Sequence, residues 1–546
     1  MNKPIISIKN LSVDYITDDN YARAVRNVSF EVSSGEIFGL VGESGSGKST
    51  VVQAMMRILP PPAVISGGEV FINGKNIITS SKNDILGSRW KEISIVMQSA
   101  LNALNPVLSV RDQIQDVLKT HKRLTGEQAI IKAKELLSLV DIEHSRLNSY
   151  PHQLSGGMKQ RVIIAIALAI MPPIVIMDEP TTALDVIVER EIISKIIELR
   201  KKLGLTIVFI THDLNLLLEF VDRLAIMKNG KIVELDNVKN IQSGGQHAYT
   251  RKLIGSIPSA SGKRKKGLLS KPISLDFPKT PILEVRNLKK EFQSPGLLSK
   301  DNLIAVNDIS FKIFEGEIVG LVGESGSGKS TIAKLVTRLI RPSMGSIYLD
   351  GKDRKITDSR NVPLEYRKNV QMVFQDPFGS LNSIHTVYHH LTRPLIRHGL
   401  KNQKGMYQHI VDLLEKVGLT PGEKFAEKFP HEMSGGERQR VSIARALSLD
   451  PKIIVADEPT SMLDVSIRME ILEIFAKMRK ENNLTVLFIT HDLASARYLA
   501  DRIIVLKNGK IIEQNKSEDL IQTPVEKYTK DLIKAASPGW LNMMAK

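Results

Sequence analysis

The sequence contains no cysteine among its 546 residues. Disulfides, thiolate metal sites and iron–sulfur clusters are therefore excluded, and a reducing compartment fits this composition. Long hydrophobic runs are also missing. The most apolar stretch, Val162 to Met177, is interrupted by Pro172 and Pro173 and is too short to cross a bilayer. The N-terminal residues Met1 to Pro4 lead into no apolar signal-peptide core. The sequence predicts a chain with neither a membrane span nor a secretion signal.

Acidic residues are outnumbered by basic ones. The chain has 75 lysines and arginines against 59 aspartates and glutamates, which gives a formal net charge of +16. An excess of this size indicates either a well-solvated basic surface or an anionic partner such as a nucleotide, a nucleic acid or the inner membrane face. The length is sufficient for more than one domain, each with its own core.

A glycine-rich stretch, Gly42 to Thr50, fits the phosphate-loop pattern G-x-x-x-x-G-K-[ST]. The apolar run Ile37 to Val41 precedes it like a buried strand, and a helix-compatible segment, Ser49 to Leu59, follows it. The glycines let backbone N–H groups point at an anion, and the helix N-terminus adds partial positive charge. We expect Lys48 to reach the β- and γ-phosphates of a nucleotide and the hydroxyl of Ser49 to hold Mg²⁺.

The sequence contains an internal repeat, because the same nine residues recur unchanged at Gly323 to Thr331. Lys48 and Lys329 are 281 positions apart. Other landmarks repeat at a distance of 279 positions: Ser155 and Ser434, Asp178 and Asp457, His212 and His491. A repeat of this length indicates domain duplication, and a chance match to the phosphate-loop pattern is a poor explanation.

Both copies have the same order of segments. Each opens with a strand-like segment, passes through a region with a helical pattern, and then shows short apolar runs. Continuous apolar runs between helical segments predict an α/β fold with buried parallel strands and crossover helices. We expect a first domain at 1–258, a flexible basic linker at 259–281 and a second domain at 282–546. The basic cluster Lys263 to Lys266 in the linker is read as solvated, with contact to anionic lipid as the alternative.

Two carboxylates, Asp178 and Glu179, follow an apolar run that ends at Met177. A strand that ends in two carboxylates suits a Mg–nucleotide site at the carboxyl end of a sheet. We therefore expect Asp178 in the Mg²⁺ shell and Glu179 beside the attacking water. A second turn of small residues, Ser155 to Gly157, precedes a helical segment. It indicates another anion-binding helix start, while a plain N-cap at Ser155 is the structural alternative.

With these motifs in order, the chain resembles a pair of nucleotide-binding domains of the ATP-binding cassette superfamily, fused in one polypeptide. The resemblance covers nearly the whole chain. It implies that each domain has a core parallel sheet, an N-terminal antiparallel β subdomain and a helical subdomain. The motifs of the first copy are the phosphate loop, Gln98, Ser155 to Gly157, Asp178-Glu179, Ala183 to Asp185 and His212; those of the second are the phosphate loop, Gln375, Ser434 to Gly436, Asp457-Glu458, Leu463-Asp464 and His491.

The resemblance also implies roles for these residues. Glu179, His212, Glu458 and His491 are expected to be catalytic, with each histidine contacting the γ-phosphate. Ser49, Gln98, Asp178, Ser330, Gln375 and Asp457 are expected in the metal shell. Tyr15 and Phe292, at the ends of the first strands, are expected to stack on adenine, with ordinary sheet packing as the alternative. Nucleotide contacts are expected from Gly42, Ser44, Gly45, Ser46, Gly47, Lys48, Ser49, Thr50, Ser155, Gly156, Gly157, Gly323, Ser325, Gly326, Ser327, Gly328, Lys329, Ser330, Thr331, Ser434, Gly435 and Gly436.

Departures from the family pattern are small. The segments Ser155 to Gly157 and Ser434 to Gly436 are the signature of the family, and Met433 replaces the usual leucine before the second of them. Met462 replaces an alanine, and Met97 and Ser99 flank Gln98 where Phe and Asp are commoner. No catalytic side chain is lost. The resemblance therefore implies two competent ATPase sites with ATP and Mg²⁺, and the missing cysteines imply no iron–sulfur cluster. Because the signature lies on the helical subdomain in this family, Ser434 to Gly436 are expected to close the site of Lys48, and Ser155 to Gly157 that of Lys329.

The segments after the two histidines point to one branch of the superfamily. Gln246 to Leu253 and Thr523 to Leu532 resemble the His-Pro-Tyr-Thr tail of oligopeptide, dipeptide and nickel importer ATPases. This implies an ATPase subunit on the cytoplasmic face of the membrane, bound to two permease subunits that receive substrate from an extracytoplasmic binding protein. Peptides are the first expectation for the cargo, while nickel chelates, glutathione-like thiols and oligosaccharides stay open.

A second hypothesis is a soluble tandem ATPase that acts on ribosomes or nucleic acid, which the charge of +16 permits. The linker argues against it, because ribosome-acting relatives usually have a long charged helical linker. Here the linker is short and contains Pro272, Pro278 and Pro281. A third hypothesis, an exporter ATPase, is disfavoured by the importer-like tails. We therefore expect no nucleic-acid partner.

Overall fold

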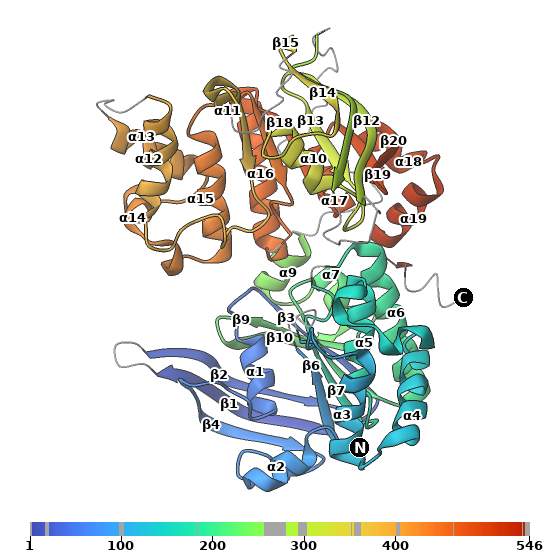
Figure 1. Cartoon of the computed structure of the whole chain (residues 1–546). Coiled ribbons are helices and arrows are strands. Elements are labelled where there is room, and N and C mark those ends of the chain that lie inside the picture. The colour runs from blue at the N-terminus through green and yellow to red at the C-terminus, as the bar shows by residue number, and fades with distance from the viewer. Residues whose placement is uncertain are drawn as a thin grey trace.

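The computed structural model describes residues 3–16, 21–97, 103–182, 184–255, 280–292, 303–350, 352–353, 362–399, 405–461, 463–537 and 539–540. Two halves of similar architecture lie one above the other in Figure 1, with the first half in blue to green and the second in yellow to red. The predicted duplication and the α/β class are confirmed. The borders of the domains and of the linker 259–281 stay a prediction, since 256–279 lie outside the described residues.

Each half contains a six-stranded sheet with one antiparallel edge strand. In the first half the order is β10-β9-β3-β8-β7-β6, and only β10 runs antiparallel to its neighbour. Its strands are β3 (Ile37–Gly42), β6 (Ile93–Val96), β7 (Ile174–Asp178), β8 (Thr206–Thr211), β9 (Arg223–Lys228) and β10 (Lys231–Asn237). The second half has the order β16-β17-β18-β13-β19-β20, formed by β13 (Ile318–Val322), β16 (Val370–Val373), β17 (Ile453–Asp457), β18 (Thr485–Thr490), β19 (Arg502–Lys507) and β20 (Lys510–Lys516).

A second, four-stranded antiparallel sheet covers part of each half, as the family resemblance implied. Its order is β2-β1-β4-β5 in the first half and β12-β11-β14-β15 in the second. The strands are β1 (Ile6–Ile16), β2 (Tyr21–Val32), β4 (Ala63–Ile72), β5 (Lys75–Asn76), β11 (Leu283–Phe292), β12 (Leu303–Ile313), β14 (Met344–Leu349) and β15 (Lys352–Asp353).

The helices follow the same order in both halves. Those of the first half are α1 (Lys48–Met55), α2 (Lys82–Ser88), α3 (Val110–Lys122), α4 (Gly126–Leu139), α5 (Gly156–Ala167), α6 (Val186–Leu203), α7 (Leu214–Leu217), α8 (Val238–Gln242) and α9 (Ala248–Gly255). Those of the second are α10 (Lys329–Val336), α11 (Leu364–Asn369), α12 (Val387–Arg397), α13 (Met406–Lys416), α14 (Gly422–Glu427), α15 (Gly435–Leu447), α16 (Val465–Asn482), α17 (Leu493–Leu499), α18 (Ser517–Gln522) and α19 (Lys527–Ala536). None of these helices combines the length and apolarity that crossing a bilayer requires.

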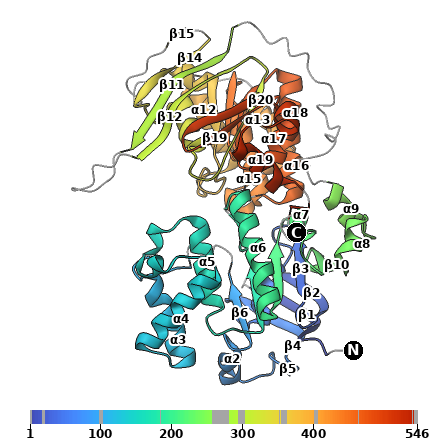
Figure 2. The same ribbon diagram turned by 90° about the vertical axis from the view of Figure 1, so that its right-hand side faces the viewer.

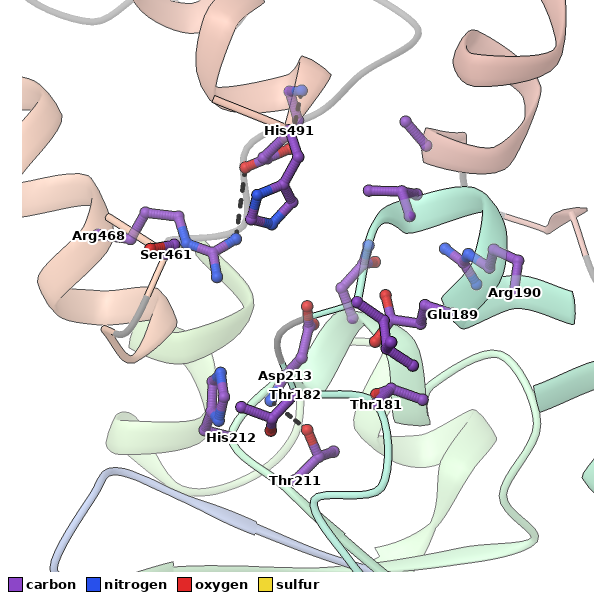
Figure 3. A pocket seen from close by; sticks show the side chains of 16 residues that line it. Thr181, Thr182, Glu189, Arg190, Thr211, His212, Asp213, Ser461, Arg468 and His491 are labelled. Atoms are coloured by element: carbon purple, nitrogen blue, oxygen red, sulfur yellow. Dashed lines mark hydrogen bonds and ion pairs between the residues drawn. The ribbon is translucent and has the colours of Figure 1, made fainter. Parts of the chain in front are cut away.

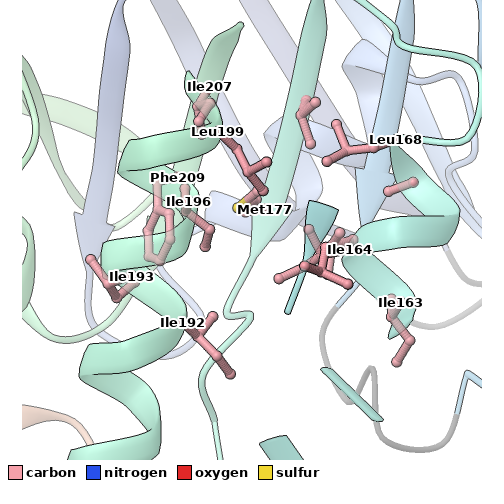
Figure 4. Packing of buried hydrophobic residues seen from close by; sticks show 14 of the residues in the cluster. Ile163, Ile164, Leu168, Met177, Ile192, Ile193, Ile196, Leu199, Ile207 and Phe209 are labelled. Atoms are coloured by element: carbon pink, nitrogen blue, oxygen red, sulfur yellow. The ribbon is translucent and has the colours of Figure 1, made fainter. Parts of the chain in front are cut away.

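The central sheet is buried on both faces, which explains the continuous apolar runs in its strands. Alternate residues of each strand point to opposite faces. Met177 and Phe209 belong to the core that lies under α5, α6 and the helical region. Ile176 and Val208, one position earlier, belong to the core under α1 and the antiparallel sheet. Figure 4 shows the first of these cores, where α6 residues such as Ile196 lie against Met177 and Phe209.

The two halves meet along α6 and α19, which pack against each other. Figure 2 shows this junction, with α6 running up from the first half to the second. Arg190 of α6 is buried, donates from Nε to the carbonyl oxygen of Ala535 at 3.0 Å and forms a 2.8 Å ion pair with Glu219. Ile187 packs against the core of the second half, and Trp540 packs against that of the first. Helix α19 and Trp540, near the C-terminus of the chain, thus pack against the first half.

Candidate functional site

The phosphate-loop stretch of the first half connects β3 to α1, as predicted. Its lysine, Lys48, is buried, and its Nζ donates to the carbonyl oxygens of Gly42 at 2.7 Å and Glu43 at 2.9 Å. Gly47 has a φ of 100°, and a Cβ there would lie 2.5 Å from the carbonyl oxygen of Ala24, so the position needs glycine. Burial lowers the pKa of Lys48. The loop holds a buried cation that donates to two neutral carbonyl groups and has carboxylates such as Glu179 nearby, and such a cation suits an incoming anion.

The second half repeats this geometry around Lys329. Its Nζ donates to the carbonyl oxygens of Gly323 and Glu324, both at 2.7 Å. Gly328 has a φ of 104°. In each loop one serine hydroxyl, that of Ser46 or Ser327, is buried without a hydrogen-bond partner among the described residues. Such orphaned polar groups indicate that the loops are built to receive a ligand with oxygen atoms.

Two of the three predicted metal residues contact each other in each half. Ser49 donates from Oγ to Oδ1 of Asp178 at 3.2 Å, and Ser330 donates to Asp457 at 3.1 Å. Burial and the charge of the adjacent glutamate raise the pKa of both aspartates to about 6. A hydroxyl and a carboxylate oxygen side by side, in a place where an added positive charge would be favourable, fit Mg²⁺. Gln98 lies outside the described residues, so the metal role expected of it has no geometry here.

Each predicted catalytic glutamate contacts the predicted histidine of its own half. Nδ1 of His212 lies 3.2 Å from Oε1 of Glu179, and Nδ1 of His491 lies 3.3 Å from Oε2 of Glu458. Although burial raises the pKa of Glu179, the hydrogen bond and charge of His212 lower it to about 2. The same contact raises the pKa of His212 against the effect of burial. Glu179 is therefore a carboxylate at neutral pH, able to accept a hydrogen bond from water.

The backbone of these glutamates is unusual. Glu179 has a φ of 50° and Glu458 a φ of 46°, in the left-handed region that residues with a side chain rarely adopt. Each N–H donates at 2.9 Å to a carbonyl of the next strand, Ile210 or Ile489, which holds the conformation. Gln375, the other predicted metal residue, donates from Nε2 to Oε2 of Glu458 at 2.9 Å. Gln375 thus contacts the predicted catalytic carboxylate directly in the second half.

The two aromatic residues lie at the edges of the sites. Tyr15 places its hydroxyl 3.5 Å from Oγ1 of Thr50, the last residue of the first phosphate loop. Phe292 is 40% exposed and lines, together with Lys329, a cavity of about 450 Å³. An exposed ring at the mouth of a phosphate site suits stacking on a base, which stays the favoured interpretation.

The signature serines have a local role in this structure. Ser155 accepts a hydrogen bond from the N–H of Met158, and Ser434 accepts one from that of Glu437, both at 3.3 Å. Each is the N-cap of its helix, α5 or α15, and both side chains face solvent. The plain N-cap that the sequence left as an alternative is therefore present. Closure of each site by the signature of the other half stays a prediction.

A different segment contacts the opposite half, namely the residues after each predicted catalytic glutamate. Asp464 of the second half accepts a hydrogen bond from the N–H of Ser44 at 2.8 Å, and Ser466 donates to Glu43 at 3.0 Å. In the reverse direction, Thr182 and Leu184 line the cavity around Lys329. Each site is thus bordered by the other half. Ala183 and Met462, in the middle of these segments, lie outside the described residues.

The two histidines line one small cavity of about 130 Å³ between the halves (Figure 3). His212, Asp213 and Thr182 reach it from the first half, while His491, Arg468 and Ser461 reach it from the second. Arg468 forms a 3.4 Å ion pair with Asp492, the residue that follows His491. The two predicted catalytic histidines thus line the same cavity between the halves.

Sequence reasoning missed one pair of residues, the tyrosines of the two tails. The hydroxyl of Tyr528 accepts a hydrogen bond at 3.0 Å from the N–H of Glu324, inside the second phosphate loop. Burial and the charge of Glu43 raise the pKa of Tyr249, its counterpart beside the first loop. Lys507 and Lys228 lie 4.5 and 4.4 Å from the centroids of the rings of Tyr528 and Tyr249. The only signal in the sequence was the repeated tail pattern, which gave no indication that it contacts the loop.

Tyr528→Phe is expected to weaken nucleotide binding at the second site. The substitution removes the acceptor for the N–H of Glu324, and losing one buried hydrogen bond costs about 1 kcal/mol, or roughly a fivefold change in affinity. Titration with ADP measures the effect. Tyr407→Phe, at an exposed position on α13, is the matched control. Equal ADP affinity in Tyr528→Phe and the unmodified chain would contradict a role for this hydroxyl in holding the loop.

Comparisons with known proteins agree with this geometry. The family model described as ABC transporter matches residues 25–182 and 306–461, once in each half. The chain belongs to the ABC transporter family. The model described as oligopeptide/dipeptide transporter, C-terminal region, matches residues 233–278, so it covers the first tail and not the second. The recognition of a tandem ABC ATPase of the peptide-transporter type is confirmed.

The relatives match along nearly their whole length. The chain is 38% identical to the glutathione import ATP-binding protein GsiA of Shigella dysenteriae serotype 1, over 97% of this chain and 89% of that protein. It is 37% identical to the peptidoglycan transport ATP-binding protein YejF of Agrobacterium fabrum, over 98% of this chain and 96% of that protein. A solved dimeric ABC cassette, MJ0796 bound to ADP and Pi, is 31% identical over 43% of this chain and 98% of its own, with a TM-score of 0.39. As a member of this family, the chain is an ATPase.

Proposed function

We propose that this ABC protein is the ATP-hydrolysing subunit of an importer for short peptides, peripheral to the cytoplasmic face of the membrane. The observation that carries the proposal is the match to an ATP-binding protein of glutathione import over 97% of this chain and 89% of that protein. Glutathione is a tripeptide, and peptidoglycan, named for the second relative, contains short peptides. The peptide-transporter match in the first tail supports the same cargo class.

The residues of each site have different roles in ATP binding and hydrolysis. The buried Lys48 would exchange its carbonyl partners for phosphate oxygens, which offer negative charge. Ser49 and Asp178 would hold Mg²⁺, which when bound neutralises charge on the β- and γ-phosphates. Glu179 accepts a hydrogen bond from the attacking water and orients it. His212 keeps Glu179 ionised and in place. Hydrolysis here is driven by positioning and charge stabilisation.

Transport requires partners in the membrane, and two permease subunits with a substrate-binding protein are the proposed set. Support comes from large apolar side chains left exposed on the loops that follow the two glutamine motifs. Val107 is 75% exposed in the first half, and Ile384 and Phe378 are 71% and 49% exposed in the second. These loops lead into the helical regions, on which the family resemblance implies a groove for a helix of the membrane partner. The segments expected to dock are 100–107 and 378–386, and residues 100–102 of the first lie outside the described residues.

Val107→Asp combined with Ile384→Asp is expected to reduce peptide uptake roughly tenfold or more, because a charge in an apolar interface costs several kcal/mol. ATP binding by the isolated chain is expected to be unchanged. Uptake of labelled glutathione or dipeptide into vesicles, with the permeases present, measures the effect. Ile131→Asp, at another exposed apolar position on α4, is the control. Full uptake in the double variant would show that docking occurs elsewhere.

Co-purification from cells tests the proposal as a whole. Affinity capture of the full chain is expected to recover integral membrane proteins with it. Recovery of ribosomal RNA in stoichiometric amount, without membrane proteins, would instead support a tandem ATPase that acts on ribosomes. Nothing in the named functions of the relatives favours that alternative.

A further inference from the structure

A cavity in the second half, apart from both phosphate loops, is lined by cationic side chains. It has a volume of about 710 Å³ and lies between the C-terminal parts of α11, α12 and α15. No carboxylate lines it within the part of the chain that the structure describes. Its charged or titratable lining consists of Arg367, Arg393, Arg397, Arg445, His390 and His398. A cavity lining with several cationic side chains favours a bound anion.

The arginines come from three different helices, so the cluster depends on tertiary structure. Arg445 is at the end of α15, where its Nη1 donates to the carbonyl oxygen of Ser380 at 2.7 Å, and burial lowers its pKa. Arg393 and Arg397 are one turn apart on α12 and exposed. Neither of the α12 guanidinium groups has a carboxylate partner among the residues described. Their donors remain available to a ligand in the cavity.

The pKa values of His390 and His398 are lowered in part by the positive charge of this cluster. Burial lowers the pKa of His390, and the charge of Arg445 lowers it further. Burial also lowers the pKa of His398, together with Lys368, Arg397 and Arg367. An anion in the cavity would relieve this repulsion and allow both imidazoles to donate hydrogen bonds.

The first half does not have this cluster, although its fold is the same. The spacing of equivalent elements shows which positions of the two halves correspond. The spacing is 277 residues between the starts of β6 and β16 and of α3 and α12, and 279 residues between those of α5 and α15. At the positions that correspond to Arg367, Arg393, Arg397 and Arg445 stand Trp90, Asp116, Thr120 and Ile166. The ring of Trp90 lies 5.6 Å from that of His121, the counterpart of His398. The cluster is therefore a property of the second half and not a requirement of the cassette fold.

We propose that this cavity is a third anion site, which binds a small molecule with a di- or triphosphate group. Guanidinium forks match phosphate oxygens in pairs, and one phosphate brings a charge of about −1.5 to −2 at neutral pH. A peptide supplies one charge per acidic side chain, so a di- or triphosphate concentrates more charge in a smaller volume. The volume of about 710 Å³ lies within the usual range for small-molecule sites, about 300–1,000 Å³.

The site is next to the catalytic machinery of the second half. A neighbouring cavity of about 790 Å³ shares Arg367, Gln371, Pro394 and Arg445 with it and extends to Gln375 and Ser330. The carboxylates Asp376 and Asp457 line only that neighbouring cavity. A ligand among the arginines would thus occupy a cavity that adjoins the one lined by Gln375, the residue that contacts Glu458. This placement does not depend on the transported cargo, so the proposal stands apart from the proposed function.

Inorganic pyrophosphate is the probe for the test, titrated into the full chain with saturating ADP, which occupies both phosphate loops. The unmodified chain is expected to bind one pyrophosphate. R393Q/R397Q, at exposed positions, is expected to bind it at least roughly tenfold more weakly, because two charge-assisted contacts are lost. K119Q/K122Q removes two exposed charges from α3, the corresponding helix of the first half, and is expected to change nothing. ADP affinity in the same variants checks that the phosphate loops are intact.

Protection from the arginine reagent phenylglyoxal locates the site. With pyrophosphate present, Arg393 and Arg397 are expected to be modified more slowly, as measured by mass spectrometry. Absence of a pyrophosphate site in ADP-saturated protein, or equal weakening in R393Q/R397Q and K119Q/K122Q, would overturn the proposal. So would arginine-dependent binding of a hexaglutamate peptide without binding of pyrophosphate, since that result would make the cavity a receptor for an acidic polypeptide.

Discussion

The double variant E179Q/E458Q is expected to bind ATP and to hydrolyse it roughly 10² to 10⁴ times more slowly, the range that a positioned general base contributes. An amide has no negative charge with which to polarise the attacking water. In the structure Glu179 is held by its contacts with His212 and Thr182, at 3.2 and 3.1 Å. Glutamine has the same shape, so the fold is expected to persist and the chain to accumulate in an ATP-loaded, closed form.

Phosphate release at saturating ATP measures the rate, and retention of labelled ATP on the chain measures the trapped state. The control, E127Q/E423Q, replaces exposed glutamates in the first turns of α4 and α14 and is expected to retain the full rate. The single variants E179Q and E458Q show how much each site contributes to the rate of ATP hydrolysis. Turnover near the unmodified rate in E179Q/E458Q would remove both residues from the catalytic role.

Ser155→Arg is expected to block closure on the nucleotide bound by Lys329, while Lys48 still binds its own ATP. The reason is the crossed arrangement of the halves. Asp464 already accepts from the N–H of Ser44, and Leu184 of the first half lines the cavity around Lys329. If the halves approach further, α5 is expected to present its N-terminus to the γ-phosphate in the second site, where a bulky cation in place of the small hydroxyl prevents contact.

Crosslinking with a γ-phosphate photoprobe tests this arrangement. Label from ATP bound at Lys329 is expected near Ser155, and label from ATP bound at Lys48 near Ser434. Because both halves belong to one chain, closure is not expected to require a second copy. Ser145→Arg, at an exposed position in the same region, is the control and is expected to close normally. Label on the signature of the same half as the phosphate loop would rule out the crossed arrangement.

Prediction from the sequence succeeded where the chemistry is local. A phosphate loop needs a strand, a glycine-rich turn and a helix that are consecutive in the chain, so the nine residues from Gly42 to Thr50 were enough to place Lys48 and Ser49. Asp178 was predictable for a similar reason, because a strand end directs its carboxylate to the edge where the other parallel strands also end. The duplication then assigned the same roles to the second half without further assumptions.

Tertiary structure alone decided the contacts between distant segments. Ser44 and Asp464 are 420 residues apart and Glu324 and Tyr528 are 204 apart, and no local pattern indicates that these groups meet. The left-handed backbone of Glu179 is also invisible in the sequence, since it depends on the hydrogen bond that the next strand supplies. Periodicity and motifs describe which groups a segment can offer. The packing of α6 on α19 and of α12 on α15 decides which of these groups face each other. This packing depends on many weak contacts across the whole chain.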